Sequence, residues 1–182
     1  MLNVREIPKT DIHLLDYAQD IFITYFTDLY KGNSIDQLQM STEVQAYLDT
    51  IFEKEKNNFI NDSNLFACLA HLDNKIVGFS FFGPIDNSNT ILIRTLPINL
   101  AYKDIELAIR QEIIMHAFKK FPKIEKTAIM VRKANKTHES FCMQANFKKY
   151  NQIYEDSLYI KTNYNALIYN GYILRRSMSS MK

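Results

Sequence analysis

Apolar residues recur at helical spacing in two N-terminal stretches that follow a short strand. Residues 3–7 predict the strand, which Pro8 ends because proline has no backbone N–H to donate. Thr10 or Asp11 can cap a first helix, whose apolar positions continue at intervals of three and four residues. A second periodic stretch predicts another helix from residue 41 or 42 to about residue 59.

The middle of the chain changes to the patterns of buried strands. Residues 65–72 are nearly all apolar, and the dipeptide at 73–74 is a good hairpin turn into a second strand at 75–82. Residues 90–96 predict the next strand, which Pro97 ends. A long amphipathic pattern then predicts a helix from about Asp104 to residue 121.

The last part of the pattern returns to strands. Residues 128–131 are a buried strand, followed by an Asn-led turn at Asn135 and a short helix. One more strand near 148–154 and an alternating strand at 156–162 complete the series. Hairpin strands followed by strand, helix and strand predict an α/β (α+β) fold: a mixed, mostly antiparallel central sheet with helices on both faces.

The length of 182 residues suits a single domain, which we assign to residues 1–162. Residues 163–182 are then a C-terminal extension, although they contain apolar side chains that a free linker would not carry. The extension either adds a strand or helix to the domain or packs against a second copy. A monomer and a homodimer are therefore both consistent with the sequence.

Several classes of protein are disfavoured by the composition. No apolar run approaches the roughly 20 residues of a membrane span, and the N-terminus lacks the pattern of a signal peptide. Cys68 and Cys142 have neither CxxC spacing nor a nearby histidine pair, so we expect no metal site and no disulfide. A reducing cytoplasm is the expected location.

Charge is unevenly distributed along the chain. Residues 1–118 carry 9 basic and 16 acidic side chains, whereas residues 119–182 carry 13 basic and 4 acidic ones. Solvated faces explain these counts. The alternative is that the basic half attracts an anionic cofactor and the acidic half a cationic amine. The basic residues form no dense run with interleaved aromatics, so we expect no nucleic-acid partner.

The segment TAIMVRKANKTHESFCMQANF, residues 127–147, resembles the end of the conserved core of the GCN5-related N-acetyltransferases. In that family the segment reads strand, Asn, helix with a tyrosine, Gly-Phe. Here Asn135 and Phe147 keep the spacing, Cys142 takes the place of the tyrosine and Asn146 that of the glycine. NKIVGFSFFGPI and ILIRTLP resemble the family's hairpin and the strand before its cofactor loop.

This resemblance implies acetyl-CoA as co-substrate, with the pyrophosphate on backbone N–H groups at a helix start. The matching cofactor-binding residues are Leu96, facing the thioester carbonyl, Asn135, and the loop residues Ala101, Tyr102, Lys103, Asp104 and Ile105. The family's glycines are missing from this loop, and Lys103 is its one basic residue. Asp104 is expected as an ordinary N-cap of the helix. The carboxylates of Asp104 and Glu106 would compete with the phosphates for the positive end of the helix dipole.

Cys142 is the catalytic candidate, since it stands where the family places the tyrosine that protonates the leaving thiolate. A thiol with its usual pKa of about 8.5 can donate a proton, but a free cysteine is more often a small buried packing residue. Tyr150 and Tyr154 are alternatives. No carboxylate lies within residues 90–96 to act as a base.

Two functions remain open. The first is an N-acetyltransferase that moves an acetyl group to an amine of a small molecule or protein by direct attack in a ternary complex. Residues 1–62, with 11 acidic and 5 basic side chains, hint at a cationic acceptor. The second is a catalytically inactive binding or regulatory module on the same fold that has lost cofactor binding.

Overall fold

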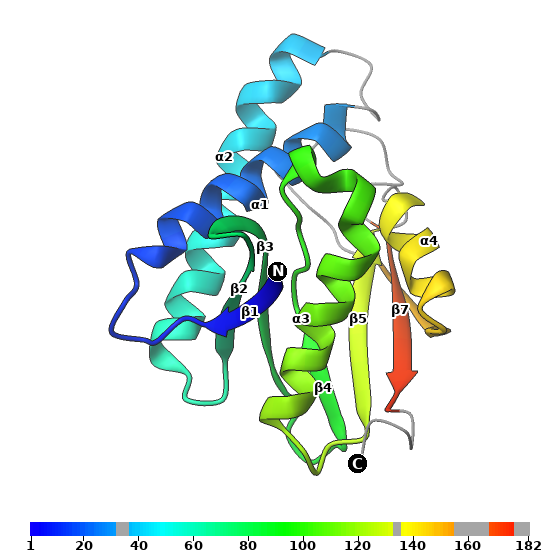
Figure 1. The fold of residues 1–182 in the computed structure, drawn as a ribbon. Helices are drawn as coiled ribbons and strands as arrows, with labels where there is room; N and C mark the ends of the chain where they lie inside the picture. Colours follow the sequence, from blue (N-terminus) through cyan, green and yellow to red (C-terminus); the bar gives the residue numbers. More distant parts are fainter. Residues whose placement is uncertain (32–36, 133–135, 155–167, 177–182) are drawn as a thin grey trace.

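The computed structural model describes residues 1–31, 37–132, 136–154 and 168–176, in which seven strands form a single sheet with helices on both faces (Figure 1). This is the mixed α+β architecture that the sequence predicts. The elements in chain order are β1 (Leu2–Glu6), α1 (Leu14–Lys31), α2 (Gln37–Asn61), β2 (Phe66–Leu72), β3 (Lys75–Pro84), β4 (Thr90–Ile93), the 3₁₀ helix η1 (Leu100–Ile105), α3 (Glu106–Lys120), β5 (Lys126–Arg132), α4 (Lys136–Gln144), β6 (Lys148–Tyr154) and β7 (Ile168–Arg175).

The strands lie in the order β1-β2-β3-β4-β5-β7-β6. Neighbouring strands run antiparallel except for β4 and β5, which are parallel. Parallel strands need a crossover connection, which η1 and α3 supply here. The carboxyl ends of β4 and β5 consequently reach the same edge of the sheet.

The helix α3 packs closely on one face of the sheet. A Cβ on Gly78 of β3 would lie 2.7 Å from Cγ2 of Ile109 and 3.4 Å from Cδ1 of Ile113. Glycine at this position therefore lets the helix approach the strand backbone. The core beneath α3 is mainly aliphatic, with Ile91, Ile93 and other strand residues fully buried.

The helices α1 and α2 cover the opposite face through a layer of phenylalanine. Phe52 of α2 lies 6.0 Å, between ring centroids, from both Phe79 and Phe81 of β3, and Phe59 lies 5.9 Å from Phe81. All four rings are almost fully buried. Side chains on β3 alternate between the two faces, which gives the sheet two separate cores.

Two turns that the sequence predicts are confirmed by their backbone angles. Asp73 and Asn74 have φ values of 48° and 67°, as a tight hairpin with left-handed central residues requires. Asn146 has φ 62°, so asparagine makes the corner for which the family uses glycine.

The C-terminal part of the sheet includes a strand from the extension. Residues 168–175, which we assigned to the extension, form β7 and pair with β5 on one side and β6 on the other. Of the alternatives expected for the extension, residues 168–175 thus follow the one in which it adds a strand to the domain. The strand predicted at 156–162 lies outside the described residues. In the part of the chain that the structure describes, no helix has both the length and the apolar character that a bilayer crossing requires.

Candidate active site

The extension of β4 contains a bulge where the sequence predicts continuous strand. Phe82 pairs with Ile93, and Gly78 forms a bridge with Ile98. The two pairs are therefore four residues apart in β3 but five residues apart in the segment that continues β4. The extra residue falls between Ile93 and Ile98, and regular pairing of β4 ends at Ile93 instead of Leu96. Bulges of this kind bend a strand and redirect its backbone groups.

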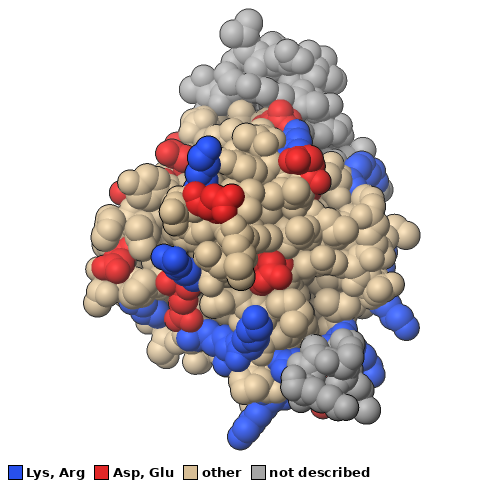
Figure 2. All heavy atoms as spheres, viewed as in Figure 1, with Lys and Arg blue, Asp and Glu red and all other residues tan. Residues whose placement is uncertain are grey.

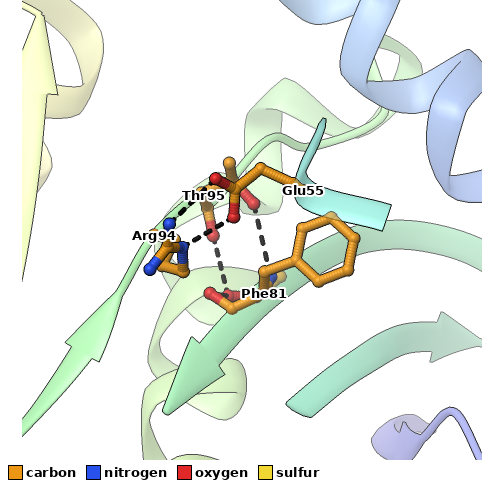
Figure 3. Close-up of polar contacts among 5 residues, drawn as sticks. Glu55, Phe81, Arg94 and Thr95 are labelled. Atoms are coloured by element: carbon orange, nitrogen blue, oxygen red, sulfur yellow. Dashed lines mark hydrogen bonds and ion pairs between the residues drawn. The ribbon is translucent and has the colours of Figure 1, made fainter. Parts of the chain in front are cut away.

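Side-chain hydrogen bonds hold this bulge in place (Figure 3). The Thr95 hydroxyl accepts from the Phe81 N–H at 3.3 Å, and the Ser80 hydroxyl donates to the Thr95 carbonyl at 2.7 Å. The Arg94 N–H still donates to the Phe81 carbonyl at 2.9 Å. The irregular segment is therefore fastened to β3, on the side away from β5.

A bidentate ion pair joins this segment to α2 (Figure 3). Nε and Nη2 of Arg94 donate to the two carboxylate oxygens of Glu55 at 2.6 and 2.9 Å. This hydrogen bonding raises the pKa of the Arg94 guanidinium, and Glu55 is mostly buried. Tertiary folding thus brings a carboxylate from α2 to the end of β4, although no carboxylate lies within residues 90–96 of the strand itself.

The strands β4 and β5 separate at their carboxyl ends. Their parallel pairing stops at Ile93 opposite Ile129, while β5 continues to Arg132 beside β7. Beyond that point the β4 chain follows β3, since Phe79 donates to the Pro97 carbonyl. Leu96 lies three residues beyond this point with 2% of its surface exposed, and within the described residues its N–H has no hydrogen-bond acceptor. Ligands of open α/β sheets commonly bind at such an edge.

The connection after Pro97 folds back on itself. The Asn99 side chain accepts from the Ala101 N–H at 3.0 Å, and the Asn99 carbonyl accepts from the Tyr102 N–H at 2.9 Å. The N–H of Glu106 donates to the Lys103 carbonyl. Part of the backbone cradle expected at Ala101 and Tyr102 is consequently occupied by groups of the same segment.

The expectation that Asp104 caps the helix is wrong. Residue 105 is the N-cap of α3 and makes no side-chain cap bond, whereas Asn99 caps the preceding η1. The 3₁₀ turn continues directly into α3, so the first helical amide, that of Glu106, donates to the Lys103 carbonyl without a capping carboxylate. Asp104 is exposed instead.

A hollow of about 480 Å³ lies between the start of α3 and α4. Of the cofactor residues named from the sequence, Lys103 and Asp104 line it; Leu96, Ala101, Tyr102 and Ile105 are not among its lining residues, and Asn135 lies outside the described residues. The remaining lining residues are Glu106 and Leu107 of α3 with Lys136, Thr137, Ser140, Phe141 and Gln144 of α4.

Both lysines at the hollow are in exposed ion pairs. The Nζ of Lys103 lies 3.2 Å from an Asp28 oxygen, and that of Lys136 lies 3.0 Å from a Glu139 oxygen. Pairs of this kind contribute about 0–1 kcal/mol, so a phosphate can compete for either lysine. Figure 2 shows most other Lys and Arg side chains of this face along its lower edge, toward the C-terminal end of α3. The basic half of the sequence is therefore not gathered at the hollow.

A fully buried arginine lies behind the hollow. Arg110 of α3 has no exposed surface, and its Nη2 lies 2.5 Å from an oxygen of Glu106 and donates to the Tyr25 hydroxyl at 2.7 Å. Its guanidinium also lies 5.4 Å from the centroid of the Phe141 ring. The i,i+4 spacing of Glu106 and Arg110 is readable from the sequence, but their burial and the contact with α1 are not.

Cys142 is a buried packing residue in this structure. It has no exposed surface, belongs to the core cluster beneath α3 and does not line the hollow. Burial raises the pKa of its thiol to about 12, so the thiol is a weaker acid than usual. Of the alternatives, Tyr150 lies against Gly171 and reaches the sulfur of Met130. Among the described residues no cluster of His, Cys, Asp and Glu side chains is suited to a metal ion.

We expect His138 to make the fold less stable in acid. Burial, and secondarily the charge of Arg110, lowers the pKa of His138 well below its usual value. The unfolded chain therefore binds this proton more readily, and stability is lost as pH falls below about 6.5. One such group changes the free energy of unfolding by up to about 1.4 kcal/mol per pH unit. Urea unfolding at pH 7 and pH 5 measures the slope, and His138→Gln should reduce it; an unchanged slope in the variant would contradict the assignment.

The comparisons with known proteins agree with this architecture. No protein-family model matches the sequence, and no curated protein matches it significantly. The fold is similar to PaiA N-acetyltransferase of Thermoplasma acidophilum in complex with coenzyme A, with a TM-score of 0.62 and 15% identity over 94% of this chain and 98% of that one. It is also similar to RimL, a ribosomal L7/L12 α-N-protein acetyltransferase in complex with coenzyme A, with a TM-score of 0.61 and 13% identity over 96% of this chain and 93% of that one. A third such structure is a mutant of the spermidine N-acetyltransferase SpeG of Vibrio cholerae, with a TM-score of 0.62 and 10% identity over 96% of this chain and 93% of that one. The chain therefore has the fold of the GCN5-related N-acetyltransferases.

Proposed function

We propose that the protein is an acetyl-CoA-dependent N-acetyltransferase acting on an amine by direct attack in a ternary complex. One observation carries the proposal: the bulge between Ile93 and Ile98 coincides with the point where β4 stops pairing with β5, and a hollow of about 480 Å³ lies between the start of α3 and α4. The Leu96 N–H just beyond that point has no acceptor among the described residues and can meet a thioester carbonyl, and the hollow offers room for phosphates. Proteins of the same fold, PaiA and RimL, are known in complex with coenzyme A.

The side chains of the hollow fit a pyrophosphate better than its backbone does. Lys103 and Lys136 provide two cations, and Thr137 and Ser140 provide two hydroxyls. The carboxylate of Glu106, which we expected to repel phosphate, is ion-paired with Arg110 and only 8% of the residue is exposed. Side-chain charges thus replace the family's glycine loop in this proposal.

The Leu96 N–H is the proposed donor to the thioester carbonyl. It has no acceptor among the described residues and lies where β4 leaves β5. When bound, acetyl-CoA supplies the activated acyl group. A backbone donor held at the developing oxyanion can lower the barrier by about 3 kcal/mol, because it needs no reorganisation during the reaction.

The acceptor in this proposal is an amine of a small molecule or a protein. RimL acts on ribosomal protein L7/L12 and SpeG on spermidine, so both classes occur on this fold. The acidic excess of residues 1–62 favours a cationic acceptor. The two free cysteines agree with a reducing, cytoplasmic compartment, and a monomer or a homodimer would both accommodate the site.

The glycine-free connection favours a second candidate, a binding or regulatory module without catalysis. The N–H groups of Ala101 and Tyr102 are bonded within their own segment, and Cys142 is buried in place of the family's tyrosine. Such a module would bind a ligand in the same hollow without turnover.

Calorimetry with acetyl-CoA separates these functions. We expect binding with Kd in the micromolar range, about −8 kcal/mol, and loss of affinity at high salt because the contacts are ionic. Turnover is then measured with spermidine and with an N-terminal peptide as acceptors. If acetyl-CoA binds but none of a panel of amines is acetylated, the result favours the module. If no binding is seen even at about millimolar acetyl-CoA, where the binding free energy would be about −4 kcal/mol, the transferase proposal is overturned.

A further inference from the structure

Ser80 is the one residue with a hydroxyl in β3, and it is completely buried. A hydroxyl removed from water costs free energy unless it finds a hydrogen-bond partner. The Ser80 hydroxyl donates to the Thr95 carbonyl at 2.7 Å. It also lies 3.2 Å from the Phe81 carbonyl, which already accepts from the Arg94 N–H, so the bond to Thr95 is the stronger of the two. A buried polar group of β3 is therefore directed at the bulge.

The bond from Ser80 sets the direction of the Leu96 N–H. The Thr95 carbonyl and the Leu96 N–H belong to one peptide group, which is planar and trans. In a trans peptide group the carbonyl and the N–H point in opposite directions. Because Ser80 holds the carbonyl toward β3, the N–H of Leu96 points away from β3, to the side on which β4 pairs with β5.

This direction is the reverse of the one that a regular strand would give. N–H groups two residues apart in a strand point to the same neighbour, and the Arg94 N–H donates to the Phe81 carbonyl of β3. A regular strand would therefore direct the Leu96 N–H to β3 as well. In the bulge two hydroxyls replace the regular bonds, since Ser80 donates to the Thr95 carbonyl and the Thr95 hydroxyl accepts from the Phe81 N–H at 3.3 Å. The Leu96 N–H is thus left free by the side chains of the bulge.

The bulge is held from both faces of the sheet. Phe79 and Phe81 pack against α1 and α2, so the alternation of side chains along β3 puts Ser80 on the face that α3 covers. From the opposite face the carboxylate of Glu55 in α2 holds Arg94 through two hydrogen bonds (Figure 3). Restraints on both sides leave the peptide group between them little freedom to turn over.

We propose that Ser80 is a positioning residue for acyl transfer, whose hydroxyl holds the Leu96 N–H so that it meets the thioester carbonyl of acetyl-CoA. The assignment rests on the proposed transferase function. Negative charge develops on that carbonyl oxygen when the amine attacks, and a donor that is already in place stabilises the charge without reorganisation. Ser80 itself touches neither acetyl-CoA nor the amine, and acts only through the backbone of the bulge.

The carbonyl stretch of bound acetyl-CoA tests this role. Difference infrared spectroscopy with an isotope label in the acetyl carbonyl separates this stretch from those of the protein. A hydrogen bond to the carbonyl oxygen lowers the frequency, so we expect a higher frequency in Ser80→Ala than in the wild type. We also expect kcat to fall about tenfold for an amine that the wild type acetylates, since a misdirected donor costs rate. The Kd of acetyl-CoA should change by less than about threefold, because the hollow is untouched.

Further variants separate positioning from a general loss of packing. Ser80→Thr keeps the hydroxyl and should keep both the low frequency and the rate. Ser88→Ala is the matched control, because it removes a hydroxyl that donates to the Ile85 carbonyl at 3.1 Å in the exposed turn after β3, and it should change neither quantity. If Ser80→Ala does not fold, Ser80→Cys takes its place, since a thiol has nearly the same size and is a weaker donor.

The possible outcomes distinguish this assignment from the proposed function. An unchanged carbonyl frequency in folded, acetyl-CoA-bound Ser80→Ala overturns the role of Ser80 while leaving the transferase intact. A change that Ser80→Thr shows equally overturns it too, because the hydroxyl would then not be the cause. If no amine is acetylated by the wild type, the frequencies alone decide. Failure of the wild-type protein to bind acetyl-CoA overturns the transferase, and the role of Ser80 with it.

Discussion

Replacing Lys103 and Lys136 together by glutamate is expected to weaken coenzyme A binding by about 100-fold or more. Both lysines line the hollow between α3 and α4, and each is held only by an exposed ion pair. A hydrogen bond to a charged group contributes about 1.5 kcal/mol or more, so the loss of two such contacts removes about two orders of magnitude in Kd. Calorimetry at low and high salt measures the effect, which should shrink as salt rises.

The matched control for this experiment lies at the other end of α3. Lys119→Glu/Lys123→Glu makes the same change in net charge on two exposed residues at and just beyond the C-terminal end of α3. We expect this control to change the affinity by less than about threefold, since screened charges beyond a Debye length interact weakly. An equal loss of affinity in both double variants would show that only the overall charge matters and that the hollow is not the phosphate site.

Replacing Arg110 alone by methionine is expected to destabilise the fold by about 3 kcal/mol. Glu106 would be left nearly buried without its cation, and an uncompensated buried charge costs more than the pair itself contributes. The Tyr25 hydroxyl would also lose its donor from α3. Urea unfolding followed by circular dichroism measures the change in the midpoint at constant m.

The double variant Glu106→Gln/Arg110→Met should recover most of this loss, because replacing a whole buried ion pair by neutral side chains is often neutral for stability. A double variant as unstable as Arg110→Met would indicate that the methionine itself packs badly against Phe141. The comparison therefore separates the electrostatic cost from the steric cost.

Much of the fold could be predicted from local pattern. The hairpin at Asp73 and Asn74 follows from two residues that accept left-handed backbone, and Asn146 makes its corner for the same reason. The strands β2, β3, β5 and β6 fall close to their predicted ranges, since each is an apolar or alternating run with turn residues at its ends. The boundaries of β4 and α3 were less predictable, because the bulge and the 3₁₀ turn depend on hydrogen bonds made by β3 and Asn99.

The candidate site could be located from the sequence only in part. The end of β4 near Leu96 and the lysine and aspartate of the connection follow from the strand pattern and the family resemblance. The sequence gives no indication that Arg94 meets Glu55, 39 residues away, or that Arg110 meets Tyr25, 85 residues away. Such contacts depend on the crossing of helices over the sheet, which local pattern does not encode.

By itself the sequence determined the type of sheet and the order of the main helices and strands from β1 to β6, because periodicity and turn chemistry act over a few residues. Only the tertiary structure decided that β7 lies between β5 and β6, that β4 departs from β5 after Ile93, and that a buried arginine stands behind the hollow. The physical reason is that strand order, register and burial are set by contacts between segments distant in the chain. Their free energies appear only when the whole core assembles.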